Sequence, residues 1–263
     1  MSSLSTTKLS VSIAGKSVCD ELDLDLDSGQ TLGILGTNGV GKTTLLLTLA
    51  GLRSAETGTI KLFGDNIHSL DRRAIAQKLG LLLQHDHDPF PGSVMEATLV
   101  GRHPYLKAWQ MEGPEDRQRA RASLAAVGLA DFQQRQLATL SGGERRRLAI
   151  ATLLTQDPEV MLLDEPTSHL DIHYQIALLN LFRAQSQQHN KSIVLVLHDV
   201  NLASHFCDKV LLLYGNGEAE YGNTRDILSA ERLHRLYDHP IIAIHGPGPL
   251  NNNIFLPDFD PQQ

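Results

Sequence analysis

A glycine-rich segment near the N-terminus carries the residues best suited to chemistry. Its members fit the pattern G-x-x-x-x-G-K-[ST], and they are Gly36, Thr37, Asn38, Gly39, Val40, Gly41, Lys42 and Thr43. Glycines let the backbone curl so that successive N–H groups face a phosphate, and a following helix adds its positive end. Lys42 would neutralise the β- and γ-phosphates, Thr43 would offer its hydroxyl to Mg²⁺, and Thr44 would hydrogen-bond the α-phosphate. A simple glycine-rich turn is the alternative, but the strand and helix predicted on either side favour a nucleoside triphosphate.

A second chemical pattern is a pair of acids at the end of an apolar run. Val160 to Leu163 is followed directly by Asp164 and Glu165. Ligands bind at such strand ends in α/β sheets. Asp164 would hold Mg²⁺ through a water, because Mg²⁺ keeps part of its hydration shell, and Glu165 would polarise an attacking water. Taken alone, the segment has a less favoured alternative, a pair of solvated loop acids.

A third pattern lies between these two. Leu140-Ser141-Gly142-Gly143-Glu144 places a helix N-cap, Ser141, before two glycines whose N–H groups are exposed at the helix start. The alternative is an ordinary capped helix. If the segment binds anions, the chain has two anion sites that one nucleotide cannot easily use together.

This third pattern resembles the signature motif of ABC ATPases, and further positions match that family in the right order. Gln84 resembles the Q-loop glutamine, Ser168 to Asp171 resembles the D-loop, and His198 resembles the switch histidine. The resemblance covers about residues 9–226. Two positions depart from the family pattern: Ile13 stands where an aromatic residue usually stacks on adenine, and Thr37 occupies a variable position.

The resemblance implies roles for these residues. Glu165, His198 and Gln84 would act in catalysis, with Gln84 also at the metal beside Thr43 and Asp164. The nucleotide would be bound by the glycine-rich segment with Thr44, and by Ser141, Gly142, Gly143, Glu144 and Asp171. In this family two subunits form a head-to-tail homodimer, so that the Ser141 helix of one covers ATP held by the other.

A further resemblance concerns the transported solute. Residues 101–105, the helix that begins at Glu115, and residues 163–172 resemble the ATPases that energise uptake of ferric siderophores, haem and cobalamin. Such subunits lie at the cytoplasmic face of the membrane, bound to two permease subunits and served indirectly by a solute-binding protein. We expect a ferric siderophore or haem before cobalamin. An ABC exporter subunit, a soluble ABC ATPase acting on ribosomes or DNA, and a P-loop kinase or GTPase are the alternatives.

Composition narrows these alternatives. The 263 residues carry a formal charge of −7, which disfavours a general nucleic-acid-binding surface. No secretory signal is recognised, and no stretch approaches the roughly 18 apolar residues that cross a bilayer. Cys19 and Cys207 are expected to be buried and reduced. The basic run from Arg145 to Arg147 is read as a solvated helix face or, equally, a partner contact, and His85 to Asp88 as a polar loop rather than a metal site.

Hydrophobic periodicity predicts the elements that would position these groups. Alternation from Glu21 to Asp27 indicates an N-terminal strand with one wet face. A crossover helix is expected after Asp171, its N-cap, with Ile172, Ile176, Leu179 and Phe182 at helical spacing. The remaining expectations are buried strands at 31–35, 79–83, 160–163 and 193–197, a helix at 43–50, and a late hairpin of 210–214 with 218–221.

The predicted fold is therefore α/β: a P-loop NTPase core with a mainly parallel sheet, an N-terminal antiparallel β element and a helical insertion, as in ABC ATPases. Residues 1–238 would form one ATPase domain. Within it, the core would comprise 1–85 and 159–238, with a helical subdomain at about 86–158. Residues 239–263, which contain five prolines, would form a small appendage or loosely ordered tail.

Overall fold

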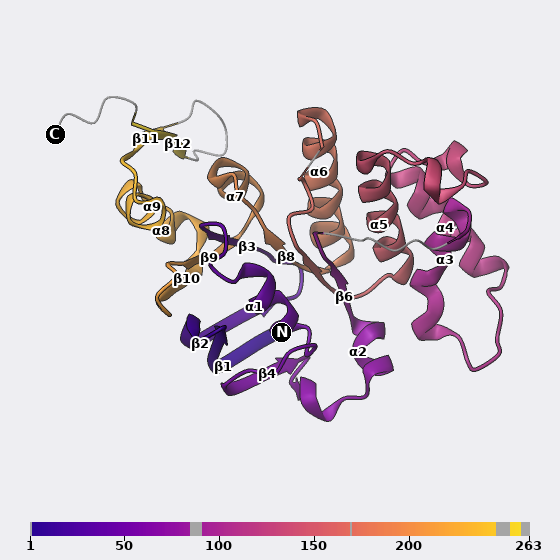
Figure 1. The fold of residues 1–263 in the computed structure, drawn as a ribbon, viewed down its shortest axis with the longest axis horizontal. Helices are drawn as coiled ribbons and strands as arrows, with labels where there is room; N and C mark the ends of the chain where they lie inside the picture. Colours follow the sequence, from indigo (N-terminus) through magenta and orange to yellow (C-terminus); the bar gives the residue numbers. More distant parts are fainter. Residues whose placement is uncertain (1, 85–90, 169, 246–252, 259–263) are drawn as a thin grey trace.

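A six-stranded sheet forms the centre of the computed structural model, which describes residues 2–84, 91–168, 170–245 and 253–258 (Figure 1). Its strand order is β10-β9-β3-β8-β7-β6, and every neighbouring pair is parallel except β9 with β10. The predicted buried parallel strands and the late hairpin are thus confirmed. The strands are β3 (Thr31–Gly36), β6 (Leu79–Leu82), β7 (Val160–Leu163), β8 (Ser192–Val196), β9 (Lys209–Leu213) and β10 (Ala219–Asn223).

A four-stranded antiparallel sheet, β2-β1-β4-β5, lies beside helix α1 (Lys42–Leu49) (Figure 1). The predicted alternation holds in β2, where Leu22, Leu24 and Leu26 are buried between exposed acids. β4 and β5 were not predicted. The strands are β1 (Ser2–Ile13), β2 (Lys16–Asp27), β4 (Thr57–Leu62) and β5 (Asp65–Asn66).

Helices occupy the region predicted as an insertion, which projects beyond β6 (Figure 1). In its described part, residues 91–156, an isolated bridge between Ser93 and Gln136 is the one β pairing. The region contains α3 (Val94–Leu99), α4 (Pro114–Ala126) and α5 (Gly142–Gln156), with 3₁₀ turns at Val100–Tyr105, Ala130–Phe132 and Leu137–Thr139.

Of the other helices, α1, α2, α6 and α7 lie between strands along the chain, and α8 and α9 follow the last strand of the central sheet. The predicted crossover helix is α6 (Ile172–His189), and Asp171 caps it by accepting a hydrogen bond from the Tyr174 N–H at 3.0 Å. Leu179 and Phe182 are buried, but Ile172 is 73% exposed, so the apolar face begins later than predicted. The rest are α2 (Arg72–Lys78), α7 (Val200–Phe206), α8 (Thr224–Ile227), α9 (Ala230–Tyr237) and a 3₁₀ turn at Ile67–Ser69.

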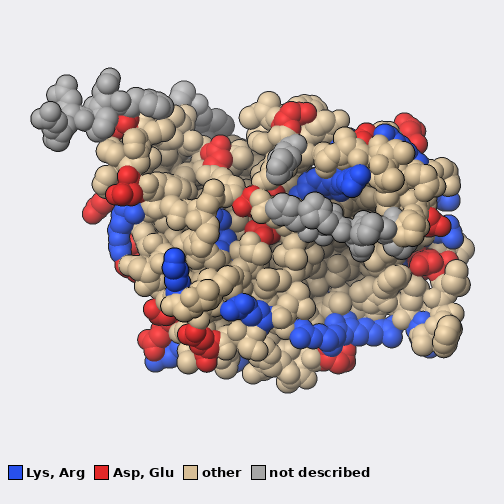
Figure 2. Space-filling model, viewed as in Figure 1, with Lys and Arg blue, Asp and Glu red and all other residues tan. Residues whose placement is uncertain are grey.

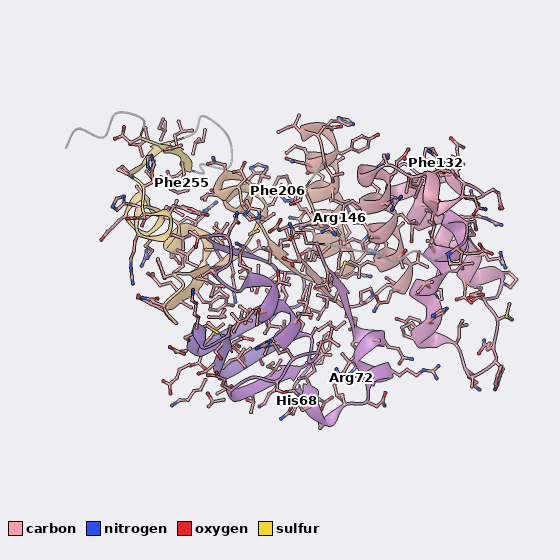
Figure 3. The ribbon with its side chains drawn as sticks, viewed as in Figure 1. His68, Arg72, Phe132, Arg146, Phe206 and Phe255 are labelled. Atoms are coloured by element: carbon pink, nitrogen blue, oxygen red, sulfur yellow. The ribbon has the colours of Figure 1, made fainter. Side chains whose placement is uncertain are left out.

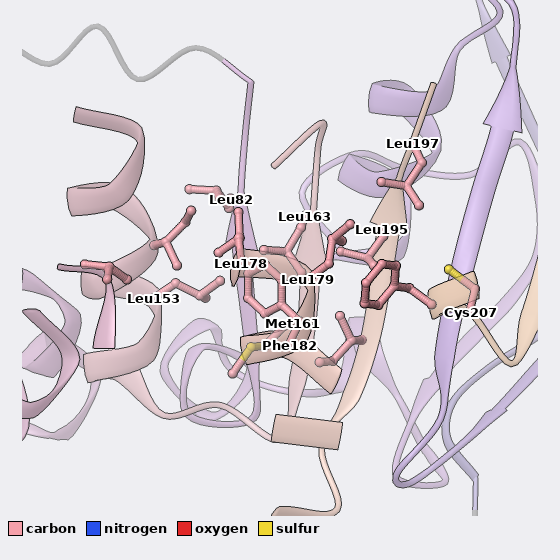
Figure 4. Close-up of a cluster of buried hydrophobic side chains, with 14 of the residues drawn as sticks. Leu82, Leu153, Met161, Leu163, Leu178, Leu179, Phe182, Leu195, Leu197 and Cys207 are labelled. Carbon is pink, nitrogen blue, oxygen red and sulfur yellow. The ribbon is translucent and has the colours of Figure 1, made fainter. Parts of the chain in front are cut away.

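Two hydrophobic cores cover the two faces of the central sheet. Side chains alternate across β7, so Val160 and Leu162 pack toward α1 and the antiparallel sheet. Met161 and Leu163 pack on the opposite face against α5 and α6, where Phe182 is fully buried (Figure 4). Because both faces of β7 are buried, its carboxyl end is held firmly in place.

The C-terminal segment contains an antiparallel pair, β11 (Ile241–His245) and β12 (Asn253–Pro257), where no strand was predicted. Phe255 is 5% exposed, and its backbone N–H and C=O bond the side chain of Asn201 on α7. The described strands of this segment are therefore connected to α7 by hydrogen bonds, and the prediction of an appendage or tail over residues 239–263 stays a prediction. Elsewhere, Cys19 and Cys207 are buried free thiols, as expected, and no helix of the described residues is long and apolar enough to span a bilayer.

Candidate functional site

The glycine-rich segment connects the end of β3 to the start of α1, as its motif requires. Gly41 has φ +106°, and a Cβ there would lie 2.4 Å from a methyl group of Val18, so only glycine fits. Lys42 is 6% exposed, and its Nζ donates to the carbonyls of Gly36 and Thr37 at 2.8 and 2.9 Å. The lysine amine therefore rests on the same loop that would receive the phosphates.

Burial lowers the pKa of Lys42, while the charges of Glu165 and Asp164 act in the opposite direction. Because burial disfavours the charged form of Lys42, an additional negative charge beside its amine would stabilise that form. A triphosphate entering this loop would supply that charge.

Thr43 and Asp164 form the pair predicted to hold Mg²⁺. The Thr43 Oγ1 donates to Asp164 Oδ2 at 2.6 Å, although the residues are 121 positions apart. Burial raises the pKa of Asp164, which is 1% exposed, and the Thr43 bond opposes this shift. Two oxygen donors converging beside a phosphate loop fit the ligands that Mg²⁺ prefers. The described residues contain no cluster of three or more His, Cys, Asp or Glu side chains, and His85 to Asp88 lie outside them.

Two predicted site residues, Gln84 and His198, meet at Glu165, together with Ser168 from the segment that resembles the D-loop. Its Oε2 accepts hydrogen bonds from Gln84 at 2.7 Å and Ser168 at 3.0 Å, and its Oε1 lies 2.6 Å from His198 Nε2. Burial raises the pKa of Glu165, but the bonds from His198 and Ser168 outweigh it, so the net pKa is lowered. Glu165 is therefore ionised at neutral pH and suited to orient a water molecule.

The Ser141 helix start is built differently. Ser141 and Glu144 form a capping box, in which the Glu144 N–H bonds Ser141 Oγ and the Ser141 N–H bonds Glu144 Oε2. Glu144 also pairs with Arg135 at 3.1 Å. These partners are all local, and none belongs to the glycine-rich segment. The structure thus groups Lys42, Thr43, Asp164, Glu165, Gln84 and His198, whereas Ser141 to Glu144 and Asp171 bond only near their own helix starts.

Gly142 adds a further observation about this helix start. A Cβ at this position would meet no atom within 4 Å, and its φ is not positive. Neither the backbone conformation nor the packing of this chain explains the glycine. A group from outside the chain that approaches the helix start would explain it.

Arg146 is a site residue that the sequence analysis missed. The prediction of a solvated face is wrong here, because Arg146 is 9% exposed and lies inside the molecule (Figure 3). Its guanidinium donates to the carbonyls of Leu83, Asp164 and Glu165. A signal was present, since Arg146 shares a helix face with Ile150 and Leu153, both buried.

The nucleobase side of the site is less defined. Ile13 is 37% exposed at the end of β1, so adenine packing there stays a prediction. Figure 2 shows one face of the molecule. Among the described residues on this face, basic side chains lie in separate groups, with acidic side chains between them.

Comparisons with known proteins identify relatives of this chain. A model described as ABC transporter matches residues 19–168. A petrobactin import ATP-binding protein of Bacillus anthracis is 35% identical over 93% of this chain and 94% of its own. An achromobactin transport ATP-binding protein of Dickeya dadantii is 35% identical over 87% and 85%, and a hemin import ATP-binding protein of Escherichia coli O157:H7 is 33% identical over 93% and 95%.

Solved structures share the fold. A chain from an inward-facing transporter described as of the metal-chelate type superposes with a TM-score of 0.87, at 29% identity and 98% coverage of both chains. An ATP-binding cassette, solved as a dimer with ADP and phosphate, gives a TM-score of 0.74 at 24% identity, covering 84% of this chain and 99% of its own.

Proposed function

Because this chain belongs to the ABC transporter family and is an ATPase subunit of an importer, we propose that it energises uptake of a ferric siderophore or haem, with cobalamin as the next candidate. The relatives are named for transport of achromobactin and for import of petrobactin and hemin, and the match covers 85%, 94% and 95% of their own lengths. The solute itself would not touch this chain. The importer's permease would carry it.

The observation that best supports the site assignment is the network around Glu165. Gln84, Ser168 and His198 come from three different segments, yet all contact this one carboxylate. Beside it, the partly buried bond between Thr43 and Asp164 lies where a triphosphate in the loop would end. We infer that Lys42 and the loop amides bind the phosphates and that Glu165 orients the attacking water.

The other residues of the site would have separate roles in hydrolysis. Thr43 and Asp164, with Gln84, would hold Mg²⁺, which when bound supplies positive charge against the phosphate oxygens. His198 would hold the γ-phosphate side of the site, and Glu165 would accept the proton of the water. Phosphoryl transfer needs mainly positioning and charge stabilisation, and these groups provide both.

The Ser141 helix start would complete the site of a second copy. Its amides and the unexplained Gly142 would approach ATP held by the partner's loop, so that two copies enclose two nucleotides head to tail. Closing and reopening would drive two permease subunits, which would hold the chain at the cytoplasmic face of the membrane. A solute-binding protein would act through them. We propose that residues 1–238 form the ATPase domain, with 86–158 as its helical subdomain.

Glu165→Gln tests this function. The variant should lose ATP hydrolysis by about 10²–10³-fold, because the amide cannot accept a proton from water. It should still bind ATP and should accumulate as an ATP-bound dimer in size-exclusion chromatography. Wild-type turnover without dimer formation would contradict the role of Glu165. Recovery of a multi-span permease with the tagged chain from membranes would support transport, whereas recovery of ribosomes would contradict it.

A further inference from the structure

Arg146 connects the Ser141 helix to the two strand ends that carry the catalytic groups. It lies five residues after Ser141 in α5, and its Nη1 donates to Leu83 O at 2.5 Å. Its Nη2 donates to Asp164 O at 2.5 Å and to Glu165 O at 3.0 Å. One guanidinium therefore spans the carboxyl ends of β6 and β7, which are paired in parallel.

Each of these carbonyls lies next to or within a functional residue. Leu83 directly precedes Gln84, and Asp164 and Glu165 carry the two carboxylates themselves. None of the three bonds goes to a catalytic side chain. Arg146 therefore acts on the backbone that places those side chains.

The backbone of Glu165 is in an uncommon conformation that such contacts can hold. Its φ is +48°, in the left-handed region, which costs a residue with a side chain on the order of 1 kcal/mol or more. In this conformation its carbonyl accepts bonds from Arg146 and from the Ser168 N–H at 3.2 Å. Its carboxylate then faces Gln84 and His198.

We propose that Arg146 is a positioning residue for ATP hydrolysis: by binding the carbonyls of Leu83, Asp164 and Glu165, it sets the direction of the Glu165 carboxylate relative to Gln84. The inference rests on the role proposed for Glu165. It also makes α5 a mechanical link, because a movement of the Ser141 helix start would reach the catalytic carboxylate through one side chain.

Arginine is required for this arrangement by its shape. Its planar fork offers several N–H donors in fixed directions, so two nitrogens can bind carbonyls on two strands. A lysine amine in the same place keeps the charge but carries a single nitrogen. Arg146→Lys is therefore the decisive change, and it leaves the buried charge paired with carbonyl oxygens.

Arg147→Lys is the matched control. Arg147 is on the same helix and also donates to carbonyls, those of Val127 and Gly128, at 3.2 and 3.3 Å. It stacks over Tyr174 and makes no bond to the catalytic strand ends. Its replacement removes an arginine fork of similar kind away from the catalytic strand ends.

The test is steady-state hydrolysis by the full-length chain. Arg146→Lys should lower kcat about 10- to 100-fold, the loss expected from small misplacement of a catalytic group, with KM for ATP changed less than about threefold. Arg147→Lys should stay within about twofold of wild type. Guanidinium ion at millimolar concentration should partly restore Arg146→Ala, because it can refill the space between the carbonyls.

A background variant separates this proposal from the proposed function. In Glu165→Gln, adding Arg146→Lys should lower the residual rate much less than the loss of about 10- to 100-fold expected in the wild-type background, since the main effect of Arg146 passes through Glu165. The positioning role is wrong if Glu165→Gln abolishes hydrolysis but Arg146→Lys keeps the wild-type kcat, whether or not its KM for ATP changes. If Glu165→Gln itself keeps the wild-type rate, the proposed function fails first.

Discussion

The carboxyl edge of the central sheet and the start of the Ser141 helix are both suited to phosphate chemistry, but only the first forms a network within one chain. At the sheet edge, side chains from distant segments bond one another: Thr43 with Asp164, and Gln84 and His198 with Glu165. At the Ser141 helix start, the capping bonds join residues three apart. The first region is therefore assembled by folding of one chain, whereas the second is the region that we propose a second copy uses.

The largest expected effect comes from the sheet edge. Lys42→Ala removes the buried cation of the phosphate loop and should lower ATP hydrolysis by about 10³-fold, with a parallel loss of nucleotide binding. Binding of a fluorescent ATP analogue and phosphate release measure the two losses. Hydrolysis at the wild-type rate in this variant would contradict the assignment of the sheet edge as the phosphate site.

A second variant tests the Thr43–Asp164 pair. Thr43→Val removes the hydroxyl and should raise the Mg²⁺ concentration for half-maximal hydrolysis about 10- to 100-fold, the usual cost of losing a metal contact. Thr43→Ser keeps the hydroxyl and is the control, expected to remain near wild type. Equal Mg²⁺ requirements for the valine and serine variants would contradict the assignment.

A third and smaller effect concerns the free energy of unfolding, which substitutions in the two regions should change in opposite directions. Burial raises the pKa of Asp164 above its ordinary value of 3.8, so the folded chain binds this proton more tightly than the unfolded chain. As the pH rises from 3.8 through the pKa of Asp164 in the folded chain, ionisation of this side chain therefore lowers the free energy of unfolding. Asp164→Asn should raise the free energy of unfolding at pH 7 by about 1 kcal/mol while abolishing Mg²⁺-dependent hydrolysis.

A substitution at the Ser141 helix start should change the free energy of unfolding in the opposite direction. Ser141→Ala removes the helix cap and should lower the free energy of unfolding by about 1 kcal/mol. Urea denaturation of both variants, without nucleotide, measures the contrast. A destabilised Asp164→Asn chain at pH 7 would show that Asp164 is held by its partners rather than strained by burial.

Much of the fold could be predicted because its strands are short, apolar and buried on both faces. The motif residues at the sheet edge could be predicted for the same reason, because the carboxyl ends of parallel strands lie at one edge of the sheet. β11 and β12 were missed because prolines and a polar run dominate that segment. Arg146 was missed because three consecutive arginines indicate a solvated face, whereas tertiary contacts with backbone carbonyls decide its position.

We propose that each site is divided between two copies, and a mixture of two inactive variants can reveal this division. Lys42→Ala disables the phosphate loop, and Ser141→Arg blocks the helix start with a bulky side chain. In a head-to-tail dimer of one copy of each, one site keeps both an intact loop and an intact helix start. An equal mixture of the two purified chains should regain up to about a quarter of wild-type hydrolysis, since half of the dimers are mixed and each has one intact site. If the mixture stays as inactive as either variant alone, although exchange of subunits is verified, the account is contradicted.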